Sequence, residues 1–184
     1  MKRWAGVLVL LALTGGCGQG DAIFNVDVWS FFNTSSADTL PYVVPPLVTN
    51  FTVSNTPQKI SLVPGAGGSL ADTVTVQGNV NFVNSTGTGT ISIQAYLAGD
   101  SASTYLPSAG FFPAPLTANV SPGTTTAVPI PPLNLTAKFD SLFTKSAVWF
   151  RLSTTLNNSG VTTVQGKAII SALNVRVVVN PKIF

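Results

Sequence analysis

The chain of 184 residues contains no histidine and no glutamate, a single cysteine, and charged residues at only 8% of its positions. The missing histidine removes the commonest general base and a common metal ligand, and a sole cysteine cannot form an intramolecular disulfide. All six acidic residues are aspartates, and no two of them are adjacent or placed in a catalytic motif. These absences predict a protein that is not an enzyme and that carries no cofactor and no metal.

Motifs that would support other functions are missing as well. The chain has no Gly-x-Ser-x-Gly nucleophile elbow and no Ser-x-x-Lys motif, and its glycine-rich run at 65–69 lacks the lysine of a phosphate-binding loop. Its cations stand singly, without the basic stripe that nucleic-acid binders use. We therefore expect no nucleic-acid partner.

The only cysteine, Cys17, follows a segment that is built like an export signal. Lys2 and Arg3 form a positive start, and the apolar run from Trp4 to Leu13 follows them. That run suits a signal peptide and is far shorter than the roughly twenty residues that a membrane-spanning helix needs. The small residues at 14–16 then lead directly into Cys17.

The sequence Thr14-Gly15-Gly16-Cys17 resembles the lipobox of bacterial lipoproteins, with Thr14 at the place where the family usually has leucine. The resemblance covers only the first twenty or so residues. It implies a signal peptide over 1–16 and acyl chains on Cys17, which would hold the protein to a lipid bilayer. The alternative is an ordinary secretory signal, cleaved near Gly18 or Gly20, which would still export the chain.

Removal of the signal changes the charge and fixes the domain plan. Loss of Lys2 and Arg3 lowers the formal net charge from +3 to +1, so the basic isoelectric point belongs mostly to the signal. Residues 17–22 form a short lipidated tether, and residues 23–184 form a single domain. The residues Gly18-Gln19 lack the aspartate that serves some lipoproteins as an inner-membrane retention signal, so the resemblance implies an outer-membrane or cell-surface destination.

Composition and periodicity predict an all-β domain. Threonine, valine, serine, asparagine, glycine and proline dominate, which favours strands joined by turns. Apolar residues alternate with polar ones along 70–83, 91–97 and 148–156, and we expect a bulge at Gly78. Shorter strands are expected at 47–53, 58–63, 116–120, 124–128 and 133–137. Roughly eight to ten strands indicate an antiparallel β-sandwich, immunoglobulin-like or related, with little or no helix.

Further local expectations concern the second half of the chain. Asn157-Asn158-Ser159-Gly160 predicts a hairpin loop that leads into a long strand over 161–179. The expected apolar face of that strand consists of Ile169, Leu173, Val175, Val177 and Val179. The one plausible helical turn runs from Phe139 to Lys145.

Two regions depart from the regular alternation and supply the candidate docking residues. Around Trp29 the apolar phase shifts, as in a bulged strand, a strand that crosses between sheets, or an apolar stretch at the membrane. The segment 99–132 is predicted to be an irregular connection rich in proline and aromatic residues, including Tyr105, Phe111 and Phe112. The last two either fold back to plug one end of the sandwich or form an exposed tip for a ligand, partner or membrane.

Two functional hypotheses remain. The first is a membrane-anchored, non-catalytic structural or interaction module of the bacterial envelope, which docks to a protein or polymer through edge strands or through the loops at 99–132. The second is a carrier for an apolar ligand, such as a lipid, held between the sheets. A cavity lined by Val76, Phe82, Ile93, Phe150 and Val175 would favour the carrier, and a filled core would favour docking.

Overall fold

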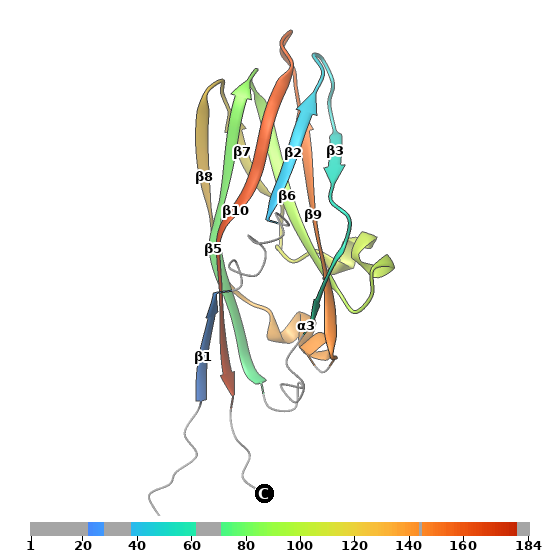
Figure 1. The fold of residues 1–184 in the computed structure, drawn as a ribbon, viewed down its shortest axis with the longest axis vertical. Helices are drawn as coiled ribbons and strands as arrows, with labels where there is room; N and C mark the ends of the chain where they lie inside the picture. The colour runs from blue at the N-terminus through green and yellow to red at the C-terminus, as the bar shows by residue number, and fades with distance from the viewer. Residues whose placement is uncertain (1–21, 28–37, 62–70, 144, 180–184) are drawn as a thin grey trace, which may run out of the picture.

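A computed structural model describes residues 22–27, 38–61, 71–143 and 145–179, and its strands form two five-stranded antiparallel sheets (Figure 1). The first sheet contains β1 (Ala22–Asp27), β2 (Thr39–Val44), β5 (Ala71–Thr86), β8 (Thr124–Asn134) and β10 (Val164–Val179). The second contains β3 (Phe51–Ser54), β4 (Gln58–Ser61), β6 (Gly89–Ala98), β7 (Leu116–Val120) and β9 (Ala147–Asn157). The sheets enclose one apolar core, which confirms the predicted antiparallel β-sandwich.

Both sheets follow the same plan. In the first, β1 and β2 lie end to end along one edge of β10, while β5 covers its other edge and β8 follows. In the second, β3 and β4 lie end to end along β9, followed by β6 and β7. Each sheet therefore has a long C-terminal strand near its middle, and short N-terminal strands complete one edge.

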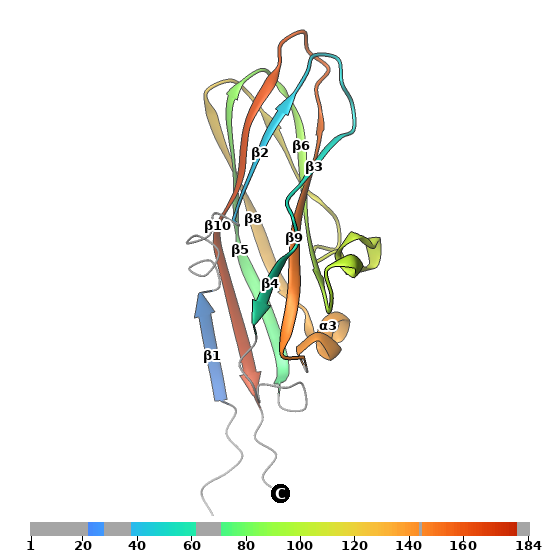
Figure 2. The same ribbon diagram turned by 45° about the vertical axis from the view of Figure 1, so that its right-hand side comes forward.

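Within the described residues, helical structure consists of two short 3-10 helices, η1 (Ala102–Tyr105) and η2 (Pro107–Ala109), and the α-helix α3 (Thr136–Phe143). Figure 2 shows η1 and η2 beside β6 and β9, with α3 near the start of β9. The expected helical turn is present, although it begins earlier, at Thr136. Asn134 starts it, because its side-chain oxygen accepts a hydrogen bond of 3.0 Å from the Thr136 N–H, so the strand expected at 133–137 ends at Asn134. Within the described residues, no helix is long and apolar enough to cross a membrane.

Alternation predicted the buried faces of three strands. Inward positions of β5, β6 and β9 are almost completely buried, as expected: Val74, Val76, Val80, Phe82, Ile91, Ile93, Ala95, Leu97, Val148, Phe150, Leu152 and Leu156. At up to 7% exposure each, these side chains supply most of the hydrophobic stabilisation. Four of the five residues named for a carrier cavity belong to this cluster, with Val175 packed against it.

The expectation for β10 is wrong in its first half. Val164, Ala168 and Ile170 point into the core there, whereas Ile169 lies on the opposite face. A register shift between Ile170 and Ala172 then moves the buried positions to Leu173. Gly78 lies opposite this irregularity, and a side chain there would meet the Ala172 carbonyl oxygen at 2.1 Å. The bulge expected near Gly78 is therefore present, with its extra residue on β10.

The predicted hairpin at 157–160 is also wrong, because β9 and β10 belong to different sheets. The turn instead carries the chain across the sandwich. Its Asn158 is 1% exposed, and its side-chain amide donates hydrogen bonds to the carbonyls of Val44, Pro45 and Thr162. A buried amide with such partners favours a connection between sheets over a two-strand turn.

The irregular connection predicted at 99–132 ends earlier than expected. The strands expected at 116–120 and 124–128 are present as β7 and β8, and β8 continues to Asn134, so within the predicted connection only 99–115 is irregular. The prediction was wrong there because proline usually indicates irregular structure, whereas β8 contains Pro129, Pro131 and Pro132. Among the described strands β8 pairs with β5 alone, so it forms an edge of that sheet, which is the position where strands tolerate proline best.

Alkaline unfolding provides a test of the core around Tyr42. The side chain is 1% exposed, and burial raises its pKa from 10.0 to about 12. The unfolded chain therefore loses its tyrosine proton first, so stability from this group is complete below pH 10 and is lost as pH rises toward 12. We expect the free energy of unfolding of the native protein to fall by about 2 kcal/mol more than that of Tyr42→Phe over this range. Denaturant titrations at each pH measure this, and Tyr105→Phe, a change at an exposed ring, should keep the native slope.

Candidate functional site

The connection 99–115 folds back onto the second sheet instead of projecting from it. Phe111 and Phe112 are 8% and 3% exposed, and the Phe111 N–H donates a 2.6 Å hydrogen bond to the Ala95 carbonyl. The Phe111 ring stacks on Phe139 of α3, with 6.4 Å between ring centroids. Of the two alternatives for this pair, the structure has the folded-back one, which removes both rings as surface contacts.

A buried arginine, Arg151, holds the connection 99–115 against the second sheet, and we call this set of contacts the arginine clip. Arg151 of β9 is 5% exposed, and its guanidinium lies between the rings of Tyr96 and Tyr105, 4.1 and 4.5 Å from their centroids. Its Nε and Nη2 donate to the Thr104 carbonyl at 3.1 and 2.9 Å, and its Nη1 donates to the Ser54 hydroxyl at 2.9 Å. The planar fork therefore joins η1 to the outer face of the second sheet.

Asp100 holds the start of the same connection. Its carboxylate accepts hydrogen bonds from the Ser103 hydroxyl at 2.7 Å and the Ser103 N–H at 2.8 Å. These bonds lower the pKa of the Asp100 carboxyl, and the positive charge of Lys145 lowers it further. The carboxylate is therefore ionised and fixed in place at neutral pH.

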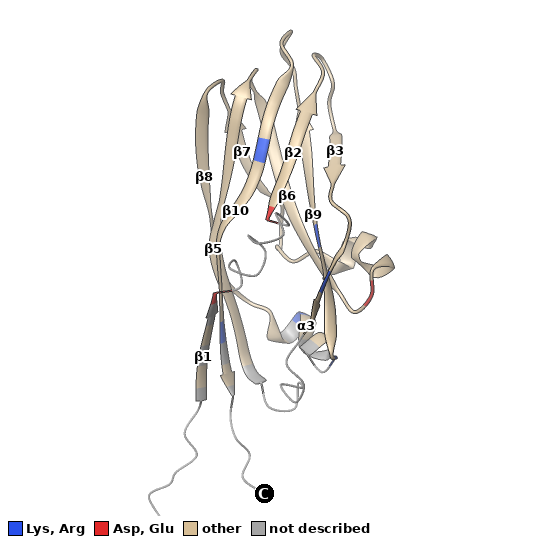
Figure 3. Ribbon diagram, viewed as in Figure 1, with Lys and Arg blue, Asp and Glu red and all other residues tan. Residues whose placement is uncertain are grey.

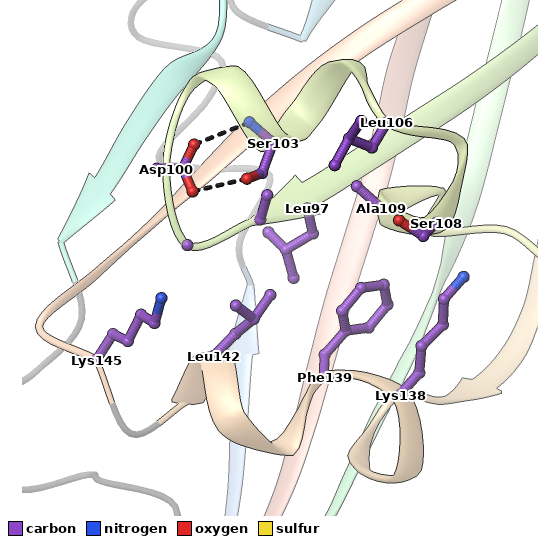
Figure 4. Close-up of a pocket in the computed structure, with 12 residues that line it drawn as sticks. Leu97, Asp100, Ser103, Leu106, Ser108, Ala109, Lys138, Phe139, Leu142 and Lys145 are labelled. Atoms are coloured by element: carbon purple, nitrogen blue, oxygen red, sulfur yellow. Dashed lines mark hydrogen bonds between the residues drawn. The ribbon is translucent and has the colours of Figure 1, made fainter.

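Between the connection and α3 lies an open cleft of about 310 Å³ (Figure 4). Leu106 and Ala109 line the side of the connection, and Phe139 and Leu142 of α3 face them. Lys138 of α3 and Lys145, which follows α3, lie on opposite sides of Figure 4. Asp100 is the single acidic side chain among the lining residues. The cleft thus combines apolar walls with an excess of one positive charge.

A second surface lies at the end of the sandwich where β2, β5, β7 and β9 finish. We call it the distal end and define it by the turns at 45–50, 87–88, 121–123 and 158–163. Leu47 and Val161 are 72% and 84% exposed there, in neighbouring turns joined by a 3.2 Å hydrogen bond from the Leu47 N–H to the Gly160 carbonyl. These turns contain no charged residue, and Figure 3 shows no charge at this end.

Leu47 has an unusual backbone as well as an exposed side chain. Its φ of 59° lies in the left-handed region, which bulky residues rarely adopt. The turn keeps this conformation because long-range hydrogen bonds hold both of its sides. The Asn158 amide binds the Val44 and Pro45 carbonyls, and the Asn50 N–H donates to Asn157 Oδ1 at 2.7 Å. The leucine is therefore presented on a fixed loop.

The sequence-predicted site residues differ in exposure, and two of them lie outside the described residues. Cys17 and Trp29 lie outside the described residues, Tyr105 is 59% exposed above Arg151, and Phe111 and Phe112 are buried. Sequence reasoning missed Arg151, although a lone arginine within an alternating strand was a usable signal. It also missed Leu47 and Val161, whose only signal was an aliphatic residue beside turn-forming residues. Across the described ranges, no group of three or more His, Cys, Asp or Glu side chains could hold a metal.

Comparisons with known proteins found no matching family model and no matching curated protein. Among solved structures, the VP2 subviral particle of infectious bursal disease virus is similar at a TM-score of 0.45 and 11% identity, over 87% of this chain and 33% of that one. The structure of the Gx strain of the same virus gives 0.41 and 11%, over 90% and 33%. A particle of human norovirus GI.7 gives 0.27 and 16%, over 94% and 36%. The chain thus spans about a third of the length of these proteins, and we argue function from its own residues.

The arginine clip can be tested by replacing Arg151 with methionine, which keeps the apolar stem and removes the guanidinium with its hydrogen-bond donors. The Thr104 carbonyl and the Ser54 hydroxyl then lose their donors, so we expect a loss of about 2 kcal/mol in the free energy of unfolding. Amide exchange in η1 and η2 should rise in parallel. Arg151→Lys, which keeps the charge without the fork, should show most of both effects. Native-like exchange in Arg151→Met would contradict the clip.

Proposed function

We propose that the chain is an exported, lipid-anchored and non-catalytic interaction module of a bacterial envelope, which docks to another envelope component through its distal end. The anchor is the acylated Cys17, and the destination is the outer membrane or the cell surface. The observation that carries the docking role is the exposed pair Leu47 and Val161, held on two hydrogen-bonded turns at an uncharged end of the sandwich.

The energetics of the pair favour docking. An exposed leucine in a left-handed conformation combines a strained backbone with a side chain that gains nothing from folding. Docking into an apolar socket would bury both aliphatic side chains at small entropic cost, because the turns are already fixed. Since the turns carry no charge, no charged group would have to be desolvated there.

The position of this end also fits an anchored protein. Ala22, the first described residue, pairs with Val179, whereas Val164 pairs with Val44 beside the distal turns. The anchor side and the distal end therefore lie at opposite ends of β10. At about 3.3 Å per residue, that strand separates them by roughly 50 Å. An acylated Cys17 would hold the sandwich at the bilayer and present Leu47 and Val161 away from it.

The packed core supports docking over transport of a ligand between the sheets. Val76, Phe82, Ile93 and Phe150 are 0 to 3% exposed within one buried cluster. A ligand between the sheets would have to separate these side chains, at a cost set by the apolar surface that they bury. The nearly chargeless outer faces, rich in serine and threonine, are compatible with an envelope protein or polymer as partner.

The anchor is tested by Cys17→Ser. Growth with an alkyne-tagged fatty acid should label the native protein and leave the variant unlabelled, because only the thiol can accept the lipid. The variant should also leave the membrane fraction after export. Equal labelling or equal membrane partitioning of the two proteins would remove the anchor from the proposal.

Docking is tested by a photo-crosslinking amino acid at position 161 in intact cells, with position 43 as control. Val43 is an aliphatic residue on β2 that is 53% exposed and lies just before the distal turn 45–50, so it controls for adjacent surface of similar chemistry outside the proposed contact. We expect a discrete adduct from position 161 only. Adding Leu47→Asn should reduce its yield by about tenfold, the loss typical of an interface anchor.

The choice of asparagine makes the docking result interpretable. Asparagine tolerates the left-handed conformation of Leu47, so Leu47→Asn should keep the thermal stability of the native chain. A lower adduct yield then reports lost contact and not unfolding. Adducts that are the same at positions 43 and 161, or insensitive to Leu47→Asn, would refute docking through the distal end.

A further inference from the structure

We propose that the cleft between the connection 99–115 and α3 binds a small aliphatic carboxylate, with its chain between the apolar walls and its head at Lys138. This site is separate from the distal end and does not depend on docking there. It also differs from a carrier site, because the ligand would lie outside the two sheets.

The shape of the cleft suits a single aliphatic chain. Leu106 and Ala109 form one wall of the cleft, Phe139 and Leu142 form the other, and Leu97 lies between them. Ala98 of β6 also lines the cleft. Leu97, Ala98, Ala109 and Phe139 are each at most 8% exposed and fixed by the surrounding core, whereas Leu106 is 54% exposed at the rim. An aliphatic chain would therefore gain mainly by covering Leu106 and the half-buried Leu142, because the other apolar lining side chains expose little surface. The volume of about 310 Å³ limits the ligand to a small molecule.

The charges of the cleft select an anion. Of its two lysines, Lys145 lies near Asp100, whose fixed carboxylate offsets it. The Lys138 ammonium donates to the neutral Gly110 carbonyl and lies 5.2 Å from the Phe139 ring centroid. An ammonium has three N–H donors, so Lys138 can donate to a carboxylate while it keeps its hydrogen bond to the Gly110 carbonyl. One monoanion would neutralise the excess charge of the lining.

Several polar groups of the cleft already make hydrogen bonds within the protein, and this favours an acyl chain over a peptide as the ligand. The Ser103 hydroxyl and N–H both bind Asp100, and the Gly110 carbonyl accepts from Lys138. Peptide amides placed between the apolar walls would find few free partners and would lose their hydrogen bonds to water. A hydrocarbon chain has no such requirement, and it brings only one polar head.

The test is a calorimetric titration of the full chain, carrying Cys17→Ser so that no attached acyl group competes, with octanoate below its micelle concentration. We expect saturable binding of one octanoate per chain. Octan-1-ol, which has the same chain and no charge, should bind about fivefold more weakly. Lys138→Gln should weaken the binding of octanoate by a similar factor and leave the affinity for octan-1-ol unchanged. Lys167→Gln, which removes an exposed lysine on β10, should change neither.

A second variant separates the site from folding. Ser108 is exposed at the rim of the cleft, so Ser108→Phe should fill the cleft and abolish octanoate binding without disturbing the core. Ser85→Phe, at an exposed serine of β5, should bind octanoate normally. Absence of saturable binding, equal affinity for octanoate and octan-1-ol, or equal loss in Lys138→Gln and Lys167→Gln would each overturn the proposal. Tighter binding of a short peptide carboxylate, such as acetyl-leucyl-leucine, would overturn the assignment to an acyl chain.

Discussion

The packing of one apolar face of each sheet against the other is the interaction on which the rest of the molecule depends. The domain has no disulfide, because the only cysteine is Cys17, and charges are too sparse for ion-pair networks. The inward side chains of β5, β6 and β9 must therefore supply most of the stability, and their burial is nearly complete. The distal end and the cleft, the two surfaces proposed to bind partners, both gain their rigidity from this core. Strand ends fix the distal turns, and buried phenylalanines fix the connection 99–115.

One of the three irregularities in the pairing of β10 with β5, the shift between Ile170 and Ala172, lets β10 contribute to two parts of that core. Before the bulge in β10, Ala168 and Ile170 point inward, and after it Leu173 takes the inward position. A strand of this length without a bulge would turn half of its apolar residues to the solvent. Gly78 is required opposite this point because a side chain there would meet the Ala172 carbonyl. The lower part of the core then closes around Phe111 and Phe139, and Phe139 also lines one wall of the cleft.

Local alternation predicted the fold class and the buried faces of β5, β6 and β9, because a residue's face in a regular strand follows from its neighbours. It failed where a distant contact decides the outcome. The local sequence at Asn158 is typical of a hairpin, and only the long-range hydrogen bonds from its side chain to the carbonyls of Val44 and Pro45 show that the turn connects the two sheets. Phe111 and Tyr105 are both aromatic residues of one connection, and only contacts with Ala95, Phe139 and Arg151 decide which is buried. Leu47 and Gly160 are far apart in sequence, so no pattern predicts that their turns join.

Arg151 links the outer face of the second sheet to the geometry of the cleft. Among the described residues Arg151 has no carboxylate partner, which is costly for a buried guanidinium, and here two aromatic faces, a carbonyl and a hydroxyl offset that cost. A hydrophobic residue could fill the same space, but it would leave the Thr104 carbonyl without a donor and η1 without a fixed position. Because η1 leads directly into Leu106 and η2, the place of Leu106 in the cleft wall depends on this clip. Arg151 lies outside the cleft lining, whereas Lys138 lies within it, donates to the Gly110 carbonyl of the same connection and keeps two further donors for the proposed ligand.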